Sequence, residues 1–205
     1  MAQKPCIKGT AITSLVEDMR KLLSDGKISQ RDIESRLTAE DLALLEETVT
    51  TSSWYDIHSY RRLTELLRDI EGEGRDEYVR ERGRARGQKL IEGGLYQQME
   101  YLGRSRVRRA MDPKARFEAY GKDLKLLVTL SQSLLNFSTW KVLPDPDHGD
   151  RYRIEVHDAA DFPDVLGWSS EGLIDAMAEL HGMSGLWSWE RIAPDFVVFR
   201  MLRPA

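Results

Sequence analysis

The spacing of apolar residues changes near residue 137, and this change constrains the fold more than any other feature. Before it, apolar residues recur every three or four positions, as Leu63, Leu66, Leu67 and Ile70 do, which is the period of an amphipathic helix. After it, short runs rich in aromatic and β-branched residues alternate, and the last two, 185–192 and 196–202, flank Ala193-Pro194-Asp195 like a hairpin. We therefore predict an α+β fold.

The expected architecture has two subregions that together form one compact domain. Residues 1–136 form a helical N-terminal body, and residues 137–205 form a small antiparallel sheet with the order ββαββ. A long helical stretch from Asp76 to Leu102 contains Gly83 and Gly87, and each interior glycine costs about 1 kcal/mol relative to alanine. We expect a kink or a close contact there.

Local capping signals indicate where the helices begin. A side-chain oxygen of Ser, Thr, Asp or Asn can accept a hydrogen bond from a free N–H of the first turn, and proline is tolerated at the first helical position. The expected caps are Thr10 or Thr13, Ser29, Thr38, Asp56, Asp112 before Pro113, and Ser169 or Ser170. For Ser169 and Ser170 this role is favoured over that of a nucleophile, because no nucleophile-elbow pattern surrounds them.

Charge is distributed unevenly along the chain. The net charge is −4, yet residues 75–116 hold 12 Lys and Arg against 6 Asp and Glu, whereas residues 140–205 hold 6 against 12. The two regions could attract a partner, pair with each other, or join subunits in a homo-oligomer. The acidic total and the lack of a helix-turn-helix pattern disfavour nucleic acid as the main partner.

Arginines dominate the basic region and could bind an anion or the acidic surface of a protein partner through forked guanidinium contacts. A solvated helix face is the plainer interpretation of the same pattern. The candidate anion-binding or partner-binding residues are Arg84, Arg86, Arg104, Arg106, Arg108 and Arg109.

Aromatic residues supply the candidate ligand pocket. Four of the five tryptophans fall in or next to the C-terminal sheet, where they could line a cavity or fill the core, and packing is the commoner use. Trp187 and Trp189 are expected to share one strand face because they are two residues apart. The candidate pocket residues are Trp54, Tyr55, Trp140, Trp168, Trp187 and Trp189.

Catalytic and metal-binding patterns are not found in the sequence. Its four histidines are scattered, its one cysteine is Cys6, and its glycines do not follow a nucleotide-loop spacing. We therefore expect no catalytic residues, no metal and no cofactor. A single cysteine, no apolar leader and no long apolar run predict a cytoplasmic protein without a membrane segment.

The chain resembles a family of about 200 residues with many paralogues in myxobacteria, which is itself distantly similar to heme-nitric-oxide-binding and vinyl-reductase-like sensor domains. The resemblance rests on Ile7-Lys8-Gly9-Thr10-Ala11, on Trp54-Tyr55 before a helix with Tyr60 and Leu63, and on the closing strands. It implies a helical body on a small sheet that binds small hydrophobic or tetrapyrrole ligands and signals to partners.

Two departures limit what the resemblance implies. Heme-binding relatives carry an axial histidine on a helix in the middle of the fold, whereas residues 78–102 contain none. Vinyl-reductase-like relatives often carry cysteines near the C-terminus, and this chain has none there. The resemblance therefore does not imply heme ligation of that type or metal-linked sensing for this chain.

The sequence thus favours a non-enzymatic sensory or adaptor domain that binds a small apolar ligand and meets a protein partner. One alternative is a small-molecule enzyme that uses the same cavity, which would need His157-Asp158 or Glu190-Arg191 to point inward. The other is a structural module that self-associates through its oppositely charged regions.

Overall fold

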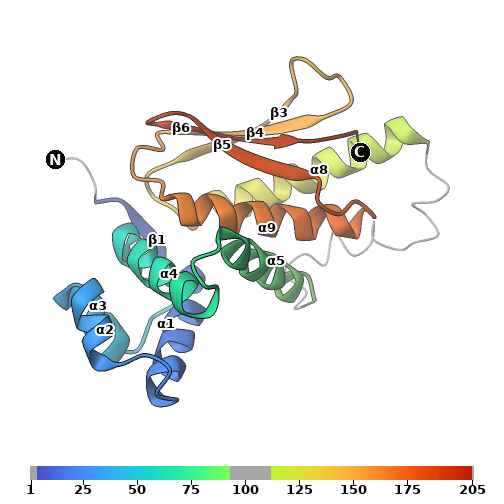
Figure 1. Ribbon diagram of the computed structural model, residues 1–205. Coiled ribbons are helices and arrows are strands. Elements are labelled where there is room, and N and C mark those ends of the chain that lie inside the picture. The colour runs from blue at the N-terminus through green and yellow to red at the C-terminus, as the bar shows by residue number, and fades with distance from the viewer. Residues whose placement is uncertain (1–3, 93–111, 205) are drawn as a thin grey trace.

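Two groups of elements meet in the computed structural model, which describes residues 4–92 and 112–204. The N-terminal group comprises β1 (Cys6–Lys8), α1 (Gly9–Ser24), α2 (Gln30–Arg36), α3 (Ala39–Glu46), β2 (Trp54–Asp56), α4 (Ile57–Glu71) and α5 (Asp76–Glu92). The C-terminal group comprises α8 (Pro113–Gln132), β3 (Thr139–Pro144), β4 (Tyr152–His157), α9 (Asp164–Leu180), β5 (Trp187–Ala193) and β6 (Phe196–Met201). In Figure 1 the sheet lies over α9 and α8, and α5 lies beneath α9. The predicted α+β class and the ββαββ order are confirmed.

The C-terminal sheet is antiparallel, with the strand order β3-β4-β6-β5. Directly opposed residues share a face, so Trp140 opposite Val156 and Trp189 opposite Phe199 point to the same side. Trp187 lies opposite the buried Met201 on that side, as expected from its spacing to Trp189. This face covers α8 and α9 and holds the aromatic part of the core.

Four predicted helix caps are present. The side chains of Ser29 and Thr38 each accept a bond from the backbone of a residue three positions on and form capping boxes with Asp32 and Asp41. Asp56 accepts from the N–H of His58, and Asp112 accepts from the N–H of Ala115. These caps depend only on neighbours in sequence, which is why they could be predicted.

The predicted caps of the first and last helices are wrong. Helix α1 begins at Gly9, because the N–H groups of Gly9 and Thr10 are bonded to the carbonyls of Ser53 and Thr51 in the segment before β2, so no threonine cap is needed. Helix α9 begins at Asp164 after Pro163, and Ser169 lies buried inside it. Ser170 lies beside it in the same buried turn.

A short two-stranded ladder joins the ends of the helical body and was not predicted. Strand β1 pairs antiparallel with β2, and Ile7 also bridges to Leu135 after α8. Asn136 fixes this junction, because its side chain accepts from the N–H of Cys6 at 2.6 Å and donates to the carbonyl of Lys4 at 3.0 Å. Three-residue strands give too little alternation to be read from sequence.

Helices α5 and α9 make the most intimate contact between the two groups. A Cβ added at Gly83 would lie 2.0 Å from the carbonyl oxygen of Ser169, and one at Gly172 would lie 1.9 Å from that of Arg80. A Cβ added at Gly87 would likewise lie 2.8 Å from the Cβ of Ala176. Of the two outcomes predicted for the glycine-rich stretch, the structure shows the close contact.

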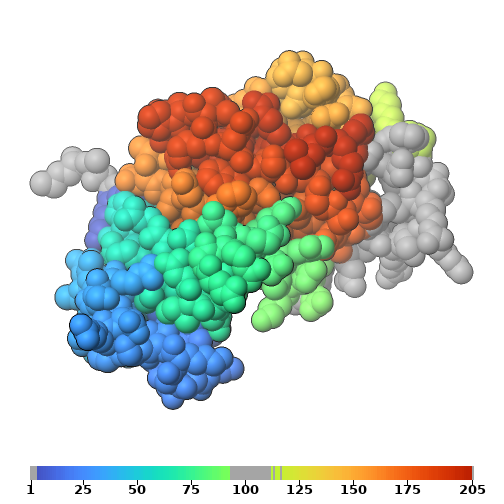
Figure 2. Space-filling model, in the orientation of Figure 1, coloured from blue at the N-terminus to red at the C-terminus, as the bar shows by residue number. Residues whose placement is uncertain are grey.

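One continuous core joins the two groups. It runs from Ile12 and Leu63 in the N-terminal helices to Leu124, Val156 and Phe199 around the sheet. Figure 2 shows the helical body, in blue and green, meeting the orange and red C-terminal part along a broad seam. Within residues 4–92 and 112–204, no helix has the length and hydropathy needed to cross a bilayer.

Candidate functional site

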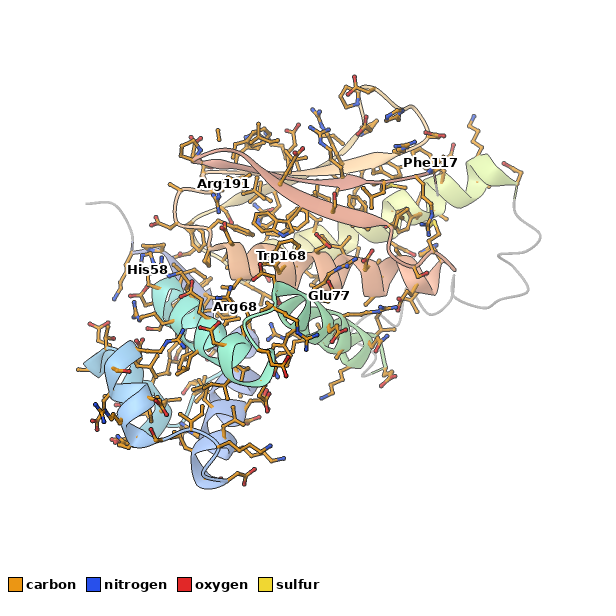
Figure 3. The ribbon with its side chains drawn as sticks, in the orientation of Figure 1. His58, Arg68, Glu77, Phe117, Trp168 and Arg191 are labelled. Carbon is orange, nitrogen blue, oxygen red and sulfur yellow. The ribbon has the colours of Figure 1, made fainter. Side chains whose placement is uncertain are left out.

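A groove of about 480 Å³ lies where four elements from both groups converge. Helix α4 contributes its C-terminal part, α5 its first residue, α9 its first two turns, and β5 its middle. Figure 3 places Arg68, Trp168 and Arg191 in succession from α4 to the sheet. The lining residues are Glu65, Arg68, Asp76, Asp164, Val165, Trp168, Trp189, Glu190 and Arg191.

Two tryptophans form the aromatic part of this groove. Trp168 on α9 and Trp189 on β5 meet edge to face, with ring centroids 5.3 Å apart and planes inclined by 81°. The indole of Trp189 lies close over Gly167, where an added Cβ would be 2.6–2.7 Å from three of its ring atoms. The absence of a side chain at Gly167 therefore lets β5 approach α9 and sets the position of this wall.

The charged groups of the groove are arranged as ion pairs. Arg68 bonds Asp76 at 2.8 Å and Asp69 at 3.1 Å. Arg191 bonds Asp164 at 2.9 Å and also donates to the carbonyl of Phe162 at 2.5 Å. Each guanidinium is thus held by groups of the chain itself, and sequence reasoning named Arg191 only as part of a pair and did not name Arg68.

The six predicted pocket residues are separated by the fold. Trp168 and Trp189 line the groove, whereas Trp140 and Trp187 pack in the core, where they are 6% and 1% exposed. Trp54 is 44% exposed beside the ammonium group of Lys8, and the hydroxyl of Tyr55 accepts from the N–H of Thr50. The structure therefore brings two of the six together.

The basic stretch of α5 pairs with acidic residues of the chain. Arg84 is ion-paired with Glu179 on α9, and Arg82 is paired with Asp18 on α1. Arg86 lies half-buried further along α5. The predicted residues Arg104, Arg106, Arg108 and Arg109 lie outside the described residues. For the part of α5 that the structure describes, the opposite charges of the two regions meet within one molecule.

A buried charge network centres on Arg80. Its Nε bonds Glu171 at 2.7 Å and its Nη2 bonds Asp175 at 2.8 Å, both on α9. Asp175 also accepts from the N–H groups of Leu186 and Trp187 at the start of β5. Burial raises the pKa of Glu171 to about 7, although Arg80 and the N–H of Trp189 favour its charged form.

This network borders a smaller cavity of about 330 Å³, lined by α5, α9 and the segment before β5. Arg80 and Asp175 line it, and both are already bonded to each other. The network fixes α5, α9 and β5 relative to one another, so its evident role is structural.

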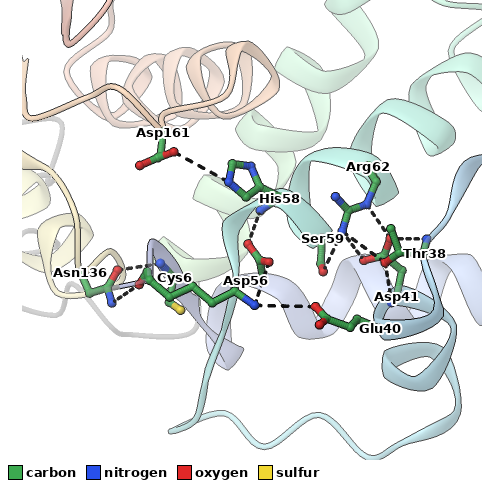
Figure 4. A network of polar contacts seen from close by, with 11 residues as sticks. Cys6, Thr38, Glu40, Asp41, Asp56, His58, Ser59, Arg62, Asn136 and Asp161 are labelled. Atoms are coloured by element: carbon green, nitrogen blue, oxygen red, sulfur yellow. Dashed lines mark hydrogen bonds and ion pairs between the residues drawn. The ribbon is translucent and has the colours of Figure 1, made fainter. Parts of the chain in front are cut away.

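The histidines do not face either described cavity. His58 is paired with Asp161 at 3.8 Å across the junction of the two groups, as Figure 4 shows. His157 stacks on Phe196 and contacts Glu155, and His148 lies exposed in the β3–β4 connection. His181, at the end of α9, bonds Asp123 at 2.9 Å. Among residues 4–92 and 112–204, no cluster of three or more His, Cys, Asp or Glu could hold a metal ion.

The two pairs that an enzyme was expected to need are placed differently. His157 lines neither described cavity, and Asp158 follows it in a bend with a φ of 56°. Glu190 and Arg191 do reach the groove, but both are exposed, and Glu190 is bonded to Arg200 at 2.8 Å. The groove's lining, as far as the structure describes it, contains no serine, threonine, cysteine or histidine that could act as a nucleophile or imidazole base.

Solved structures share this architecture, although no protein-family model and no curated protein sequence matches the chain. A mutant H-NOX protein from K. algicida in the Fe(II) unliganded state aligns with a TM-score of 0.59 and 13% identity, over 95% of both chains. The fold is that of H-NOX domains. An H-NOX protein from S. oneidensis in the Fe(II)NO state aligns at 0.52 and 13% identity, over 96% of this chain and 99% of its own.

A further H-NOX protein, a Cs mutant carrying 4-cyano-L-phenylalanine, aligns at 0.56 and 14% identity, over 97% of this chain and 98% of its own. The predicted distant similarity to H-NOX domains is therefore confirmed for the fold. Identities near 13% carry no residue roles, so the chemistry must be judged from this chain's own side chains.

The described residues do not fit a heme held by histidine. His181 is the most buried of the four histidines, but its Nε2 is bonded to Asp123 and its ring meets Tyr120 edge-on at 5.0 Å. The other three lie on the surface or at the junction, and the rest of the sequence contains no histidine.

Proposed function

We propose that this protein is a sensory or adaptor domain that uses the H-NOX fold without histidine-held heme, binds a small ligand in the groove between its two groups of elements, and signals to a protein partner. The observation that carries the proposal is the alignment with H-NOX domains over 95–97% of the chain, because solved neighbours with this fold include heme proteins such as the one studied for heme distortion.

The position of the groove supports a sensing role. Its walls come from α4 and α5 on one side and from α9 and β5 on the other, so a ligand there touches both groups at once. A ligand that binds one relative position of the two groups better than another shifts the population toward that position. This is the simplest way for the fold to convert occupancy into a change of shape.

The composition of the groove changes the expected ligand. An apolar ligand was anticipated from the tryptophans, but four carboxylates and two guanidiniums share the lining with them. A wholly apolar molecule would remove water from these ion-paired groups without replacing its hydrogen bonds, which is costly. The ligand in this proposal therefore carries polar or charged groups in addition to an apolar part.

Addition of hemin to the purified protein tests the heme-independent part of the proposal. We expect no stoichiometric complex with the absorbance spectrum of a histidine-ligated heme. Such a complex, if lost in His181→Ala but retained in His148→Ala, would contradict the proposal. His148 serves as the control because it is exposed in the connection between β3 and β4.

Native mass spectrometry of the protein purified from cells tests the ligand. A stoichiometric extra mass is expected, and a bare chain under conditions that preserve the fold would remove the ligand from the proposal. The partner contact is expected on the arginine-rich segment, so changing Arg106, Arg108 and Arg109 together to Glu should abolish partner binding. A fully retained complex would remove that surface.

A further inference from the structure

Beyond its structural role in the network around Arg80, we infer that Glu171 is a proton-operated control of the groove: its charged side chain ties Trp189 of β5 to α9, and protonation releases this tie. The inference deepens the proposed function, since it names a regulator of the same groove. It rests on that function only in taking the groove as the binding site.

The free edge of β5 is held by α9. Strand β5 lies at the end of the sheet next to β6, and in Figure 1 α9 lies beneath the sheet. The N–H of Trp187 donates to Oδ1 of Asp175 at 3.1 Å, and the N–H of Trp189 donates to Oε2 of Glu171 at 3.0 Å. Residues four apart share one face of a helix. Two carboxylates of α9 thus hold alternate N–H groups of β5.

These two carboxylates are buried and share one guanidinium. Glu171 and Asp175 are each 3% exposed. The Nε of Arg80 lies 2.7 Å from Oε1 of Glu171, and its Nη2 lies 2.8 Å from Oδ2 of Asp175. The Nη1 of the same arginine faces a third carboxylate, Glu77, at 3.4 Å. A buried negative charge that is only partly compensated favours the uptake of a proton.

The elements around Glu171 supply no second cation to it within residues 4–92 and 112–204. Glu77 and Glu81 on α5 add negative charge near Arg80. Arginines on α5, α4 and β5 are bonded to carboxylates elsewhere, in the pairs Arg84–Glu179, Arg68–Asp76 and Arg191–Asp164, and Glu65 of α4 and Glu190 of β5 are paired with Arg61 and Arg200.

Glu171 is better placed than Asp175 to take the proton. Asp175 accepts from two backbone N–H groups and from Arg80, whereas Glu171 has one backbone N–H and the same arginine. A buried carboxylate with fewer donors is less well stabilised when charged. Burial accordingly raises the pKa of Glu171 to about 7.

Protonation acts on the oxygen that faces Trp189. Oε1 of Glu171 lies against the positive charge of Arg80, which disfavours a proton there, so the proton is added to Oε2. A protonated oxygen is a donor, and it then faces the N–H of Trp189, which is also a donor. This bond is weakened, while Asp175 keeps its bonds to Arg80 and Trp187. Strand β5 is therefore released at Trp189 and stays fixed at its start.

This release alters the aromatic wall of the groove. The indole of Trp189 packs on Gly167 and meets Trp168 edge to face, so the wall depends on where the backbone of Trp189 is held. A ligand that binds the fixed wall favours the charged form of Glu171. Its affinity therefore falls as the pH falls, and by linkage its binding promotes loss of the proton.

Hydrogen exchange of the tryptophan backbone amides tests the inference, measured by NMR on protein with isotope-labelled tryptophan. The protection factor of the Trp189 amide should be lower by about tenfold or more at about pH 6 than at about pH 8. The Trp187 amide, bonded to Asp175, is the internal control, and its protection should not fall. Global stability cannot mimic this result, because protonation of Glu171 stabilises the fold as a whole and would raise protection.

Variants assign the effect to Glu171. Glu171→Gln keeps a neutral side chain at every pH, so the protection of Trp189 should differ by less than about twofold between the two conditions. Glu46→Gln, which removes an exposed carboxylate on α3, should retain the native difference. If Glu171→Gln does not fold, the comparison of Trp189 with Trp187 in the native protein decides the question.

Three results would overturn the inference: equal protection of the Trp189 amide at both pH values, a difference that persists in Glu171→Gln, or a parallel loss of protection at Trp187. The proposed function has a separate criterion. An extra mass in the native spectrum with an unresponsive Trp189 amide would retain a ligand-binding sensor and remove the proton control, whereas a bare chain with a responsive amide would remove only the ligand.

Discussion

At the scale of one residue, Trp187 is a side chain that the sequence allows either in the core or in a pocket, and the structure places it in the core. It is 1% exposed, and its Nε1 donates to the hydroxyl of Tyr120 at 2.6 Å on α8. Changing Trp187→Ala should lower the free energy of unfolding by about 3–5 kcal/mol, because a cavity forms and the Tyr120 hydroxyl loses its partner. Denaturant unfolding followed by circular dichroism measures this.

Trp54→Ala provides the matched control for that change. Trp54 is 44% exposed, so its removal should alter stability by no more than about 0.5 kcal/mol. If Trp187→Ala unfolded at the same denaturant concentration as the native protein, its place in the core would be wrong.

The raised pKa of Glu171 predicts that the stability of the fold depends on pH. Burial raises its pKa to about 7 from an ordinary value of 4.5, so the folded protein retains a proton that the unfolded chain loses between these values. Stability should therefore fall as the pH rises from about 4.5 to about 7, by at most about 3 kcal/mol, and level off above that range.

The comparison of Glu171→Gln with the native protein isolates this effect. The variant should show a flatter stability profile between about pH 4.5 and 7. Asp41 acts in a different range: burial opposes its charged form, but bonds from Arg62, Ser59 and Thr38 hold its pKa at about 2, so its contribution is lost only as the pH falls through that value. An unchanged profile in Glu171→Gln would assign the dependence to other groups.

At the scale of elements, the contact between α5 and α9 depends on glycines, which have no side chain to hold the two helices apart. Gly172→Ala would place a methyl group 1.9 Å from the carbonyl oxygen of Arg80, and a backbone atom cannot move aside as a flexible side chain can. We expect a loss of about 3 kcal/mol or more, at the upper end for overpacking, because the helices must separate.

Gly149→Ala is the control for that substitution. A Cβ at Gly149 meets nothing within 4 Å, so this change should be nearly neutral when both variants are compared by thermal unfolding. A Gly172→Ala protein as stable as Gly149→Ala would mean that α5 and α9 are further apart than the structure shows.

The elements that could be predicted are those specified by nearby residues. Ser29, Thr38, Asp56 and Asp112 cap helices through bonds spanning two or three positions, and such patterns are visible in a sequence. Ser169 has the same chemistry but lies inside α9, where its backbone carbonyl meets Gly83 of another helix. A contact between residues so distant in the chain leaves no local signal.

The groove illustrates the same limit for a candidate site. In the sequence, Trp140 and Trp187 are indistinguishable from Trp168 and Trp189 as candidate pocket residues. The structure places the first two in the core and the other two in the groove. Arg68 is one arginine among many in the sequence, and only the approach of α4 to β5 makes it part of a wall. Composition can therefore suggest residue types for a site, whereas tertiary packing selects the members.

At the scale of the whole molecule, opposite charges bind the two groups to each other. Arg80 and Arg84 of the basic region pair with Glu171, Asp175 and Glu179 of the acidic region, all on α9. Glu171 and Asp175 are buried, so removing Arg80 would leave their charge buried without its partner, which is strongly destabilising. Part of the uneven charge of the sequence is thus paired within one molecule, and self-association is not required to explain it.

The shared core and these ion pairs predict that the chain unfolds as one cooperative unit, as the expectation of a single compact domain requires. Four of the five tryptophans lie in residues 137–205, so fluorescence reports mainly on that subregion, whereas helical circular dichroism also follows the N-terminal helices. The two signals should show coincident denaturation curves. Leu63→Ala, a core change on α4, should shift both curves equally, by about 2–5 kcal/mol. If it shifted only the helical signal, the two groups would be separate folding units, and a ligand in the groove between them would act by joining domains instead of by deforming one.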